Sequence, residues 1–487
     1  MQSLFTAEDQ RANPQSCFWQ RFKAPPNVEP PSHSSWLRIK RFCGGWKRRL
    51  FRLSEHLLEV CKVEDAAPHK YVDLSWKLFE AFTETSARGT CFGFRLGSID
   101  QHEDFYAESQ EALDLWIECL QPICLLVDLN RDYRLMRPIG RGTFAEVSLA
   151  ENCEDGSLVA VKSVKKTLLS TADNLEHHVQ EIKALRRLQH PRIVRLLRVY
   201  EDDTCLHLVI DYLTGGDLYA RILVRQRYSE MKAANLFRRI LEVVAYIHSA
   251  GYVHRDIKPE NVLMAEDDCE FKLGDFGLAT EISLGSLHLR CGSPGYLAPE
   301  MLRRPTYGPQ VDMFSCGVML YYLLCGRMPF EGSSPSEVLI QNKECRLRFQ
   351  PQLWGNISKD AIELVLKLTH PDPLQRLTPK QALLHNWLSA SSLSPSTKPA
   401  RISGLRSIAT CDYVSHEFMM RNVNKMETAT VLQTAVPSSA KRTNCLASLR
   451  LPVNDDPLDE GHAPLRLKDD SSPGPGSLVW ALNAATK

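Results

Sequence analysis

The sequence lacks the features that mark secreted, membrane-spanning and zinc-stabilised proteins. Its 15 cysteines contain no CxxC pair and no recurrent spacing, which argues against a disulfide framework or a zinc site and for reduced thiols. The start of the chain has no signal-peptide pattern, and its most apolar stretch, residues 317–326, is about half the length of a membrane span. The net charge of +1 indicates no partner by itself, and no nucleic-acid partner is expected. We therefore expect a cytoplasmic protein.

The length of the chain and the changes in composition along it predict several domains. A chain of 487 residues is too long for one hydrophobic core. Residues 1–33 contain a proline-rich run and predict a flexible lead-in, whereas residues 34–125 consist of short β-prone runs that end in a helix. Residues 133–388 begin with strands and continue with long helical patterns. Residues 389–487 are predicted to be disordered, because so little apolar surface cannot offset chain entropy.

Two patterns near the start of the third segment suit the binding of phosphate groups. A glycine-rich turn lets the backbone fold closely over phosphates, although such a turn alone is a weak signal. The turn comprises Gly140, Arg141, Gly142, Thr143, Phe144, Ala145, Glu146 and Val147. Further on, Lys162 lies in an apolar strand pattern, where an unpaired ammonium is costly. Glu181, in the following helical pattern, is its expected partner.

Two acids and an amide follow at a spacing that suits metal-assisted phosphoryl transfer. Asp256 follows His254 and Arg255, Asn261 comes five residues later, and Asp275 begins an Asp-Phe-Gly triplet. Asp256 is predicted to accept the proton of an attacking hydroxyl. Asn261 and Asp275 supply the hard oxygen ligands that Mg²⁺ prefers. Because such a reaction depends mainly on positioning and charge neutralisation, this set would suffice for it.

In this order the motifs resemble those of a eukaryotic protein kinase domain across residues 133–388. The resemblance implies an α+β, bilobal fold, with a β-rich N-lobe over a helical C-lobe and ATP in the cleft. It implies ATP and Mg²⁺ as cofactors, with Asp256, Lys258, Lys162 and Glu181 as catalytic residues. The ATP-binding residues implied, besides the glycine-rich turn, are Ile139, Ala160, Lys162, Ile210, Asp211, Leu213, Asp217, Glu260 and Leu263.

The same resemblance carries expectations for residues outside the reacting set. Lys258, two residues after Asp256, marks serine/threonine kinases, and Ser293 is expected to hydrogen-bond the catalytic loop. Asp312 would brace that loop from beneath. Ala298-Pro299-Glu300 would close the activation segment, and Glu300 would pair with Arg376. Phe314 stands where the family usually has tryptophan.

Substrate choice and regulation can also be read from single positions. Asp217 and Glu260 lie where related kinases face a substrate arginine, so basic residues N-terminal to the acceptor are expected to be preferred. The alternative is that Asp217 contacts only the ribose. Arg255 precedes the catalytic aspartate and predicts phosphorylation of the activation segment, where Ser283 and Ser286 are available.

The stretches GGDLYARI, KPENVL and GRMPFEG resemble the calcium/calmodulin-dependent kinase group. Calmodulin binding stays open, because the segment after residue 397 has a poor amphipathic pattern and suits a plain linker better. No calcium-binding EF-hand loop is present in the sequence.

The N-terminal segment resembles a pleckstrin-homology domain over residues 34–125, which implies a small bent barrel of seven strands capped by a C-terminal helix. Gly44-Gly45 predicts a hairpin turn. Seven basic residues and no acid lie around it: Arg38, Lys40, Arg41, Lys47, Arg48, Arg49 and Arg52. In phosphoinositide-binding members Lys40, Lys47 and Arg49 would grip the lipid phosphates. Attraction to an anionic membrane, with peripheral recruitment, and binding of a protein partner are the alternatives.

Three functions therefore compete. The first is an active serine/threonine kinase that acts on protein substrates, with a domain that targets or inhibits it. The second is a pseudokinase, which would lack one of Lys162, Asp256, Asn261 or Asp275, and none is lacking. The third is a phosphoinositide-binding scaffold with a regulatory, weakly active kinase domain, which the complete set also disfavours.

Overall fold

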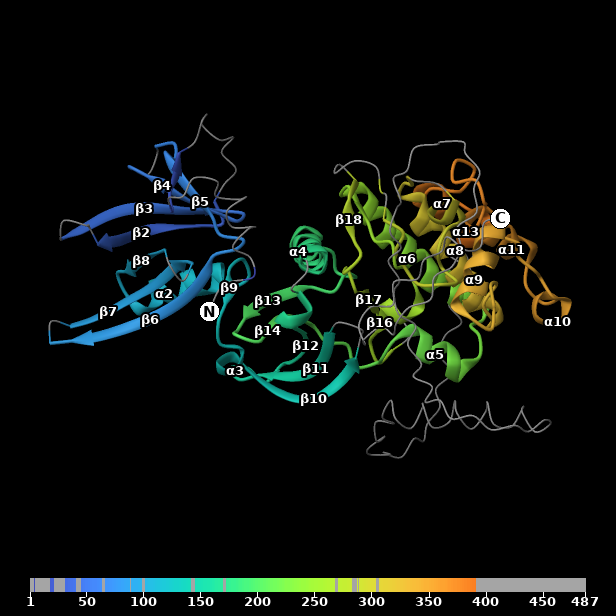
Figure 1. Cartoon of the computed structure of the whole chain (residues 1–487), viewed down its shortest axis with the longest axis horizontal. Helices are drawn as coiled ribbons and strands as arrows, with labels where there is room; N and C mark the ends of the chain where they lie inside the picture. The colour runs from blue at the N-terminus through green and yellow to red at the C-terminus, as the bar shows by residue number, and fades with distance from the viewer. Residues whose placement is uncertain are drawn as a thin grey trace, which may run out of the picture. The chain divides into compact units, whose positions relative to one another are not determined.

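The structure is a computed structural model of the chain, shown in Figure 1. It describes residues 4, 18–21, 31–40, 45–63, 66–87, 89–98, 101–141, 145–169, 172–267, 270–282, 287, 289–303 and 306–390. These residues form two compact units. The first runs to Ile182 and also includes Val194–Tyr212, and the second contains Lys183–Ile193 and the described residues from Leu213 onward.

The first unit begins with a β-rich module. Its elements are β1 Gln20–Arg21, β2 His33–Lys40, β3 Trp46–Ser54, β4 Leu57–Cys61, β5 Lys70–Asp73, β6 Leu78–Ser86, β7 Gly89–Gly97, β8 His102–Ala107 and helix α2 Gln110–Leu120. The two strands of the predicted hairpin are confirmed, because β2 and β3 pair antiparallel from His33 with Leu53 to Lys40 with Trp46; Gly44 of the predicted turn lies outside the described residues. The predicted helix is confirmed as well: Ser109 caps α2, and its Leu113, Trp116 and Leu120 are buried.

The expected closed barrel is not found among the described residues. The strand order is β1-β5-β4-β3-β2-β8-β7-β6, and β5 and β6 do not pair. The edges that would close the barrel have other partners, since β5 pairs with β1 and β6 pairs with a short strand that follows α2. The N-terminal region is therefore β-rich and carries the predicted helix, and β5 and β6 each pair with another strand instead of with each other.

The flexible lead-in predicted for residues 1–33 is wrong for Phe18–Arg21. Phe18 is buried in the core of the module, and β1 pairs with β5. The Gln20 side-chain oxygen accepts a hydrogen bond of 2.9 Å from the Tyr71 hydroxyl. Phe18 and Trp19 pack edge-to-face with centroids 5.0 Å apart. These two aromatics give the segment enough apolar surface to be held in place.

The rest of the first unit is a sheet with one long helix. Its elements are β9 Leu125–Leu126, α3 Leu129–Asp132, β10 Tyr133–Arg141, β11 Ala145–Asn152, β12 Leu158–Lys165, the 3₁₀ turn η1 Lys166–Leu169, α4 Ala172–Arg187, β13 Leu196–Glu201 and β14 Cys205–Asp211. The sheet runs β9-β13-β14-β12-β11-β10, and only β9 lies parallel to its neighbour β13. The last residues of α4 belong to the second unit.

The second unit is mainly helical. Its elements are α5 Leu218–Arg225, α6 Glu230–Ser249, β15 Tyr252–Val253, η2 Pro259–Asn261, β16 Val262–Met264, β17 Phe271–Leu273, β18 Thr280–Glu281, α7 Pro299–Arg303, α8 Gln310–Cys325, α9 Pro335–Glu344, α10 Pro351–Trp354, α11 Lys359–Leu368, α12 Pro379–Leu383 and α13 Asn386–Ala390. Helix α8 is apolar on all sides and is buried from Val311 to Cys325. It ends at Gly326, whose φ is 71° and whose added Cβ would meet the Gln226 carbonyl oxygen at 1.9 Å.

Several expectations fall on residues outside those described. They concern Gly142, Thr143 and Phe144 of the glycine-rich turn, Ser283 and Ser286, the segment considered for calmodulin, and the tail from residue 391. Within the described part of the chain, every cysteine is a free thiol. No helix there is both long enough and apolar enough to cross a bilayer.

Candidate active site

The predicted partnership of Lys162 and Glu181 is present in the first unit. Lys162 lies in β12 and Glu181 in α4, and the Lys162 Nζ is 2.6 Å from the Glu181 Oε1. The side chains are 17% and 3% exposed, so the pair is shielded from water. The sequence argument that a lysine in this strand needs an anionic partner is confirmed.

The charge on Glu181 is set by more than one neighbour. Burial by itself would raise the pKa of this carboxyl group, but Lys162 and His178 lower it to about 2. His178 lies one turn before Glu181 on α4, and its Nδ1 is 3.3 Å from the second carboxylate oxygen. Glu181 is therefore held from both sides as a carboxylate. The sequence reading named Lys162 but missed His178, whose i, i+3 spacing on a helix was the available signal.

The catalytic-loop residues of the second unit are braced as predicted. Asp312, at the start of α8, accepts backbone hydrogen bonds from His254 N at 2.9 Å and from Arg255 N at 2.8 Å. The His248 Nε2 lies 2.9 Å from the same carboxylate. Because Asp312 is fully buried, these bonds fix the loop to the core helix. Arg255 adopts a φ of 67°, a conformation that such bracing stabilises.

A compact polar cluster forms around Asp256. The Lys258 Nζ lies 2.7 Å from Asp256 Oδ2, and the Ser293 hydroxyl donates to Asp256 Oδ1 at 2.7 Å. Lys258 also donates to the Ser293 Oγ at 2.7 Å. The expectation that Ser293 keeps the hydroxyl contact to the catalytic loop is therefore confirmed.

The electrostatics of this cluster keep Asp256 ionised. Burial would raise its pKa, but the Lys258 ammonium and the Ser293 hydroxyl hold it below its ordinary value. Burial would lower the pKa of Lys258, and Asp256 raises it instead. The cluster thus holds a carboxylate with one oxygen bound to a cation and the other to a hydroxyl, a state that can accept a proton.

Asn261 and Asp275 offer oxygen atoms next to the cluster. The Asn261 Nδ2 donates to the Asp256 backbone oxygen at 2.7 Å and to its Oδ2 at 3.1 Å, which directs the amide oxygen to other ligands. Gly274, just before Asp275, donates its N–H to the Asn261 carbonyl at 2.8 Å. An amide oxygen and a carboxylate are the donors that Mg²⁺ takes in proteins, so this pair fits such an ion.

Glu260 and Asp217 form an acidic pair in the second unit. Asp217 caps α5 by accepting a bond from Ala220 N at 2.7 Å. Glu260 is largely buried, and its Oε2 has no hydrogen-bond partner among the described residues. Burial raises the pKa of Glu260, and the neighbouring Asp217 adds to the effect. A carboxylate in this state gains from the approach of a cation.

Arg255 is already engaged within the second unit. Its Nε donates to the Leu278 carbonyl at 2.6 Å, and its Nη1 is 3.2 Å from the Tyr307 hydroxyl. Tyr307 in turn donates to the Leu289 carbonyl. The sequence reading did not identify Tyr307, because no spacing in the sequence links it to Arg255.

The expected pair between Glu300 and Arg376 is confirmed. The Arg376 guanidinium meets both Glu300 carboxylate oxygens, at 2.6 and 3.0 Å. The centroid of the Phe314 ring lies 5.2 Å from the central carbon of the same guanidinium, and this ring stacks on Phe330. The phenylalanine at this position thus fills the apolar side of the ion pair.

The residues expected to bind ATP fall in both units; in the first unit they lie on neighbouring strands, and in the second they lie in loops, in η2 and in β16. In the first unit, Gly140 pairs with Val147 across β10 and β11, and Ala160 pairs with Ile210 across β12 and β14. The other members there are Ile139, Arg141, Ala145, Glu146, Lys162 and Asp211. In the second unit, Asp217 forms a bridge with Leu263; Leu213 and Glu260 are the remaining members. The Asp211 carboxylate is occupied by Arg195, so only its backbone suits the predicted contact with adenine.

The three lipid-binding candidates do not lie on one side of the β2–β3 hairpin. Lys47 pairs with Ile39, and Arg49, two residues later, shares its face. Lys40 pairs with Trp46 and therefore projects to the opposite face. The expectation that Lys40, Lys47 and Arg49 jointly grip one phosphoinositide is therefore corrected, because successive residues of a strand alternate between faces.

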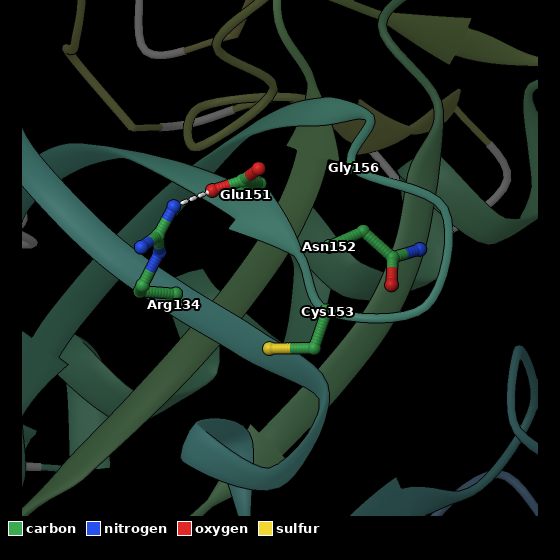
Figure 2. Close-up of a pocket in the computed structure, with 5 residues that line it drawn as sticks. All are labelled: Arg134, Glu151, Asn152, Cys153 and Gly156. Carbon is green, nitrogen blue, oxygen red and sulfur yellow. Dashed lines mark hydrogen bonds and ion pairs between the residues drawn. The ribbon is translucent and has the colours of Figure 1, made fainter.

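Figure 2 shows a cavity near the start of β10, where β11 ends and the chain turns into β12. It is lined by Arg134, Glu151, Asn152, Cys153 and Gly156, and Arg134 forms an ion pair with Glu151. None of these residues belongs to the predicted reacting set. The cavity is therefore separate from the chemistry described above.

Comparison with known proteins agrees with this geometry. The family model described as "Protein kinase domain" matches residues 133–388. A calcium/calmodulin-dependent protein kinase type 1 from Macrobrachium nipponense is 42% identical over 266 residues, 54% of this chain and 76% of that protein. A type 1B enzyme from Rattus norvegicus is 39% identical over 267 residues, 54% and 77% of the two chains. Calcium-dependent protein kinase 14 from Arabidopsis thaliana is 39% identical over 265 residues, 54% of this chain and 50% of that protein.

These matches cover the segment that holds both the Lys162–Glu181 pair and the Asp256 cluster. They also agree with the expected likeness to the calcium/calmodulin-dependent kinase group. The chain belongs to the protein kinase family and is a serine/threonine kinase that uses ATP and Mg²⁺.

Proposed function

We propose that Asp256 is the base of this kinase. It takes the proton of the substrate serine or threonine hydroxyl as that oxygen bonds to the γ-phosphorus of ATP and the bond to the β,γ-bridging oxygen breaks. Lys258 and Ser293 orient the Asp256 carboxylate and keep it ionised. Lys162, held by Glu181, would bind the α and β phosphates. Asn261 and Asp275 would hold Mg²⁺, which neutralises phosphate charge when bound.

The substrates that we propose carry a basic residue N-terminal to the acceptor. The observation that carries this proposal is Glu260, a partly buried carboxylate whose Oε2 is shielded from water and lacks a partner among the described residues, and whose pKa is raised by burial. Asp217 adds a second negative charge beside it. A guanidinium satisfies two such acids with charge-assisted hydrogen bonds, which a neutral side chain cannot do. An arginine of the substrate is therefore the preferred occupant.

A positional-scanning peptide library tests this preference. The wild-type chain should select Arg or Lys at one upstream position, and Glu260→Gln should weaken that selection by about ten- to a hundredfold, the loss of one charged hydrogen bond. Asp217→Asn keeps the cap on α5 and should weaken it less. The matched control is Glu363→Gln, an exposed carboxylate of the same unit, which should select as the wild type does. A wild-type library without any upstream basic preference would refute the proposal.

For the N-terminal module we propose attraction to an anionic membrane surface through the outer face of the β2–β3 hairpin. Trp46 is 46% exposed there, with the Arg38 guanidinium 5.3 Å and the Lys40 ammonium 5.8 Å from its ring. A tryptophan flanked by cations suits the boundary between lipid headgroups and water. This surface replaces the phosphoinositide grip that the hairpin register does not support.

Co-sedimentation with vesicles distinguishes the two faces. Phosphatidylcholine vesicles with added phosphatidylserine should bind the chain, and Arg38→Ala/Lys40→Ala should reduce that binding. The matched pair Lys47→Ala/Arg49→Ala removes the same charge from the other face and should have a smaller effect. Binding that depends on a phosphoinositide and is lost only with Lys47→Ala/Arg49→Ala would favour the lipid-gripping alternative instead.

A further inference from the structure

The N-terminal module and the kinase sheet are joined without a linker. Between α2 and β10 the chain includes a buried stretch: Cys124 and Leu125 are fully covered and Leu126 nearly so, and Leu129 is also buried, whereas Val127 and Asp128 between them are exposed. A tether between independent domains consists of exposed, polar residues. Residues 124–126 instead have the burial of a core strand.

Strand β9 connects the two sheets directly. Leu125 pairs with Leu78 of β6 on one side and with Val199 of β13 on the other, both in parallel register. The Leu125 N–H also donates to the Lys77 carbonyl at 2.9 Å. Figure 1 shows β9 between β6 and β13, so the strands of the module and of the kinase sheet form one continuous sheet.

Both faces of the kinase sheet are packed with the help of the module. On one face, Leu126 and Leu129 belong to the same core as Val161 and Val209, and this core continues into the module. On the other face, Trp76 of the module and Leu125 belong to a core formed with α4 and the strands. Its other buried members are Val164, Leu169, Val179, Ile182, Val199, Leu206 and Leu208.

That second core bears directly on the reacting pair. Val179 and Ile182 flank Glu181 on α4, and Val164 lies two residues after Lys162 on β12. Trp76 is 6% exposed and is the largest side chain of this core. The helix and the strand that present Glu181 and Lys162 thus rest on a core that is incomplete without the module.

We propose that the N-terminal module is an integral activating part of the kinase, and that Trp76 is a positioning residue that keeps α4 where Glu181 meets Lys162. Loss of the Trp76 side chain from the core that it shares with Val179 and Ile182 lets α4 move on its apolar face, and the 2.6 Å ion pair then breaks. The module consequently supports catalysis rather than inhibiting it. This inference relies on the kinase activity of the chain and not on the basic-residue preference or membrane attraction proposed above.

The experiment compares variants of the full chain. Trp76→Ala should raise the KM for ATP and lower kcat, with kcat/KM for ATP falling about tenfold, within the range of coupling between linked sites. The KM for a peptide substrate should not change. In the same variant, amide hydrogen exchange of α4 should accelerate while that of β7 and α8 stays as in the wild type. Trp76→Phe keeps an aromatic in the core and should restore most of the activity.

The matched control is Leu58→Ala. Leu58 is fully buried in β4 of the same module and belongs to the core on the opposite face of the sheet, not to the core that contains Trp76 and packs against α4. It should accelerate exchange in β3–β5 and leave the ATP kinetics and α4 exchange unchanged. If Trp76→Ala does not fold, Leu125→Ala makes a smaller deletion in the same core and should act in the same direction.

Two results would overturn the proposal. One is a Trp76→Ala chain with wild-type ATP kinetics and wild-type amide hydrogen exchange of α4. That result would mean that the module does not support catalysis. The other is an equal loss of ATP kinetics in Leu58→Ala, which would show that the module acts through its general stability and not through Trp76. Neither result bears on peptide selection, so failure here and failure of the substrate proposal can be told apart.

Discussion

The ion pair between Glu300 and Arg376 offers a quantitative test of how the second unit is stabilised. The exposed fractions of the two side chains are 2% and 0%, and both carboxylate oxygens contact the guanidinium. Arg376 also donates to the backbone oxygens of His370 and Gln310. Glu300→Gln keeps the shape of the side chain but leaves the arginine buried without a countercharge.

The expected loss follows from that burial. Removing one partner of a buried pair costs about 3–5 kcal/mol, since the remaining charge stays desolvated. For a unit of this size each kcal/mol lowers the melting temperature by about 2–4 °C, so the transition of the second unit should fall by roughly 6–20 °C. Scanning calorimetry of the full chain measures this shift.

Two controls sharpen the test. Glu363 and Lys367 on α11 form a pair with a similar separation, 2.7 Å, but their side chains are 53% and 45% exposed. Glu363→Gln should leave the transition unchanged, because water screens that pair. The double variant Glu300→Leu/Arg376→Met removes both charges and should be more stable than Glu300→Gln alone. A Glu300→Gln transition that stays within about 2 °C of the wild type would refute the reasoning.

Three further predictions concern the reacting groups. Asp256→Asn should lower the rate of phosphoryl transfer about 10²–10⁴-fold in a radiolabelled-ATP assay, because this is the usual contribution of a general base. Transfer at the wild-type rate would exclude that role for Asp256. His178→Gln keeps a hydrogen-bond donor beside Glu181 and should retain more activity than His178→Phe; equal activity would show that the 3.3 Å contact has no influence. Because burial raises the pKa of Glu260, its charge is lost at a higher pH than for an ordinary glutamate. As the pH is lowered, the ratio of kcat/KM for an arginine peptide over an alanine peptide should therefore begin to fall above the pH at which an ordinary glutamate titrates, about 4.3, and should stay flat in Glu260→Gln.

The reacting set could be predicted from the sequence because phosphoryl transfer needs particular side chains at short, fixed spacings. Asp256, Lys258 and Asn261 lie within six consecutive residues, and the loop that carries them brings them together in the structure. Lys162 and Glu181 were also predictable, since a lysine in an apolar strand needs a carboxylate. Helix α2, whose Leu113, Trp116 and Leu120 form its buried side, likewise follows from local periodicity.

Contacts between distant parts of the chain could not be predicted in this way. The role of Trp76 depends on β9 pairing with both β6 and β13, and no local pattern near Trp76 points to α4. The pairing of β5 with β1 and of β6 with β9, in place of barrel closure, was missed because closure depends on which strands compete for an edge. Similarly, Tyr307 reaches Arg255 only through the fold.

The sequence by itself determined the chemistry of this protein: a serine/threonine kinase whose reacting residues are recognisable from their spacing. The tertiary structure decided the rest, namely that Lys40 faces away from Lys47, that the Glu260 Oε2 is buried without a hydrogen-bond partner among the described residues, and that Trp76 of the N-terminal module shares a core with Val179 and Ile182 of α4. The physical reason is that the chemical groups of a motif and the periodicity of a helix or strand depend on residues that are neighbours in the sequence. Strand register, burial and shared cores arise only when segments far apart in the chain exclude water together.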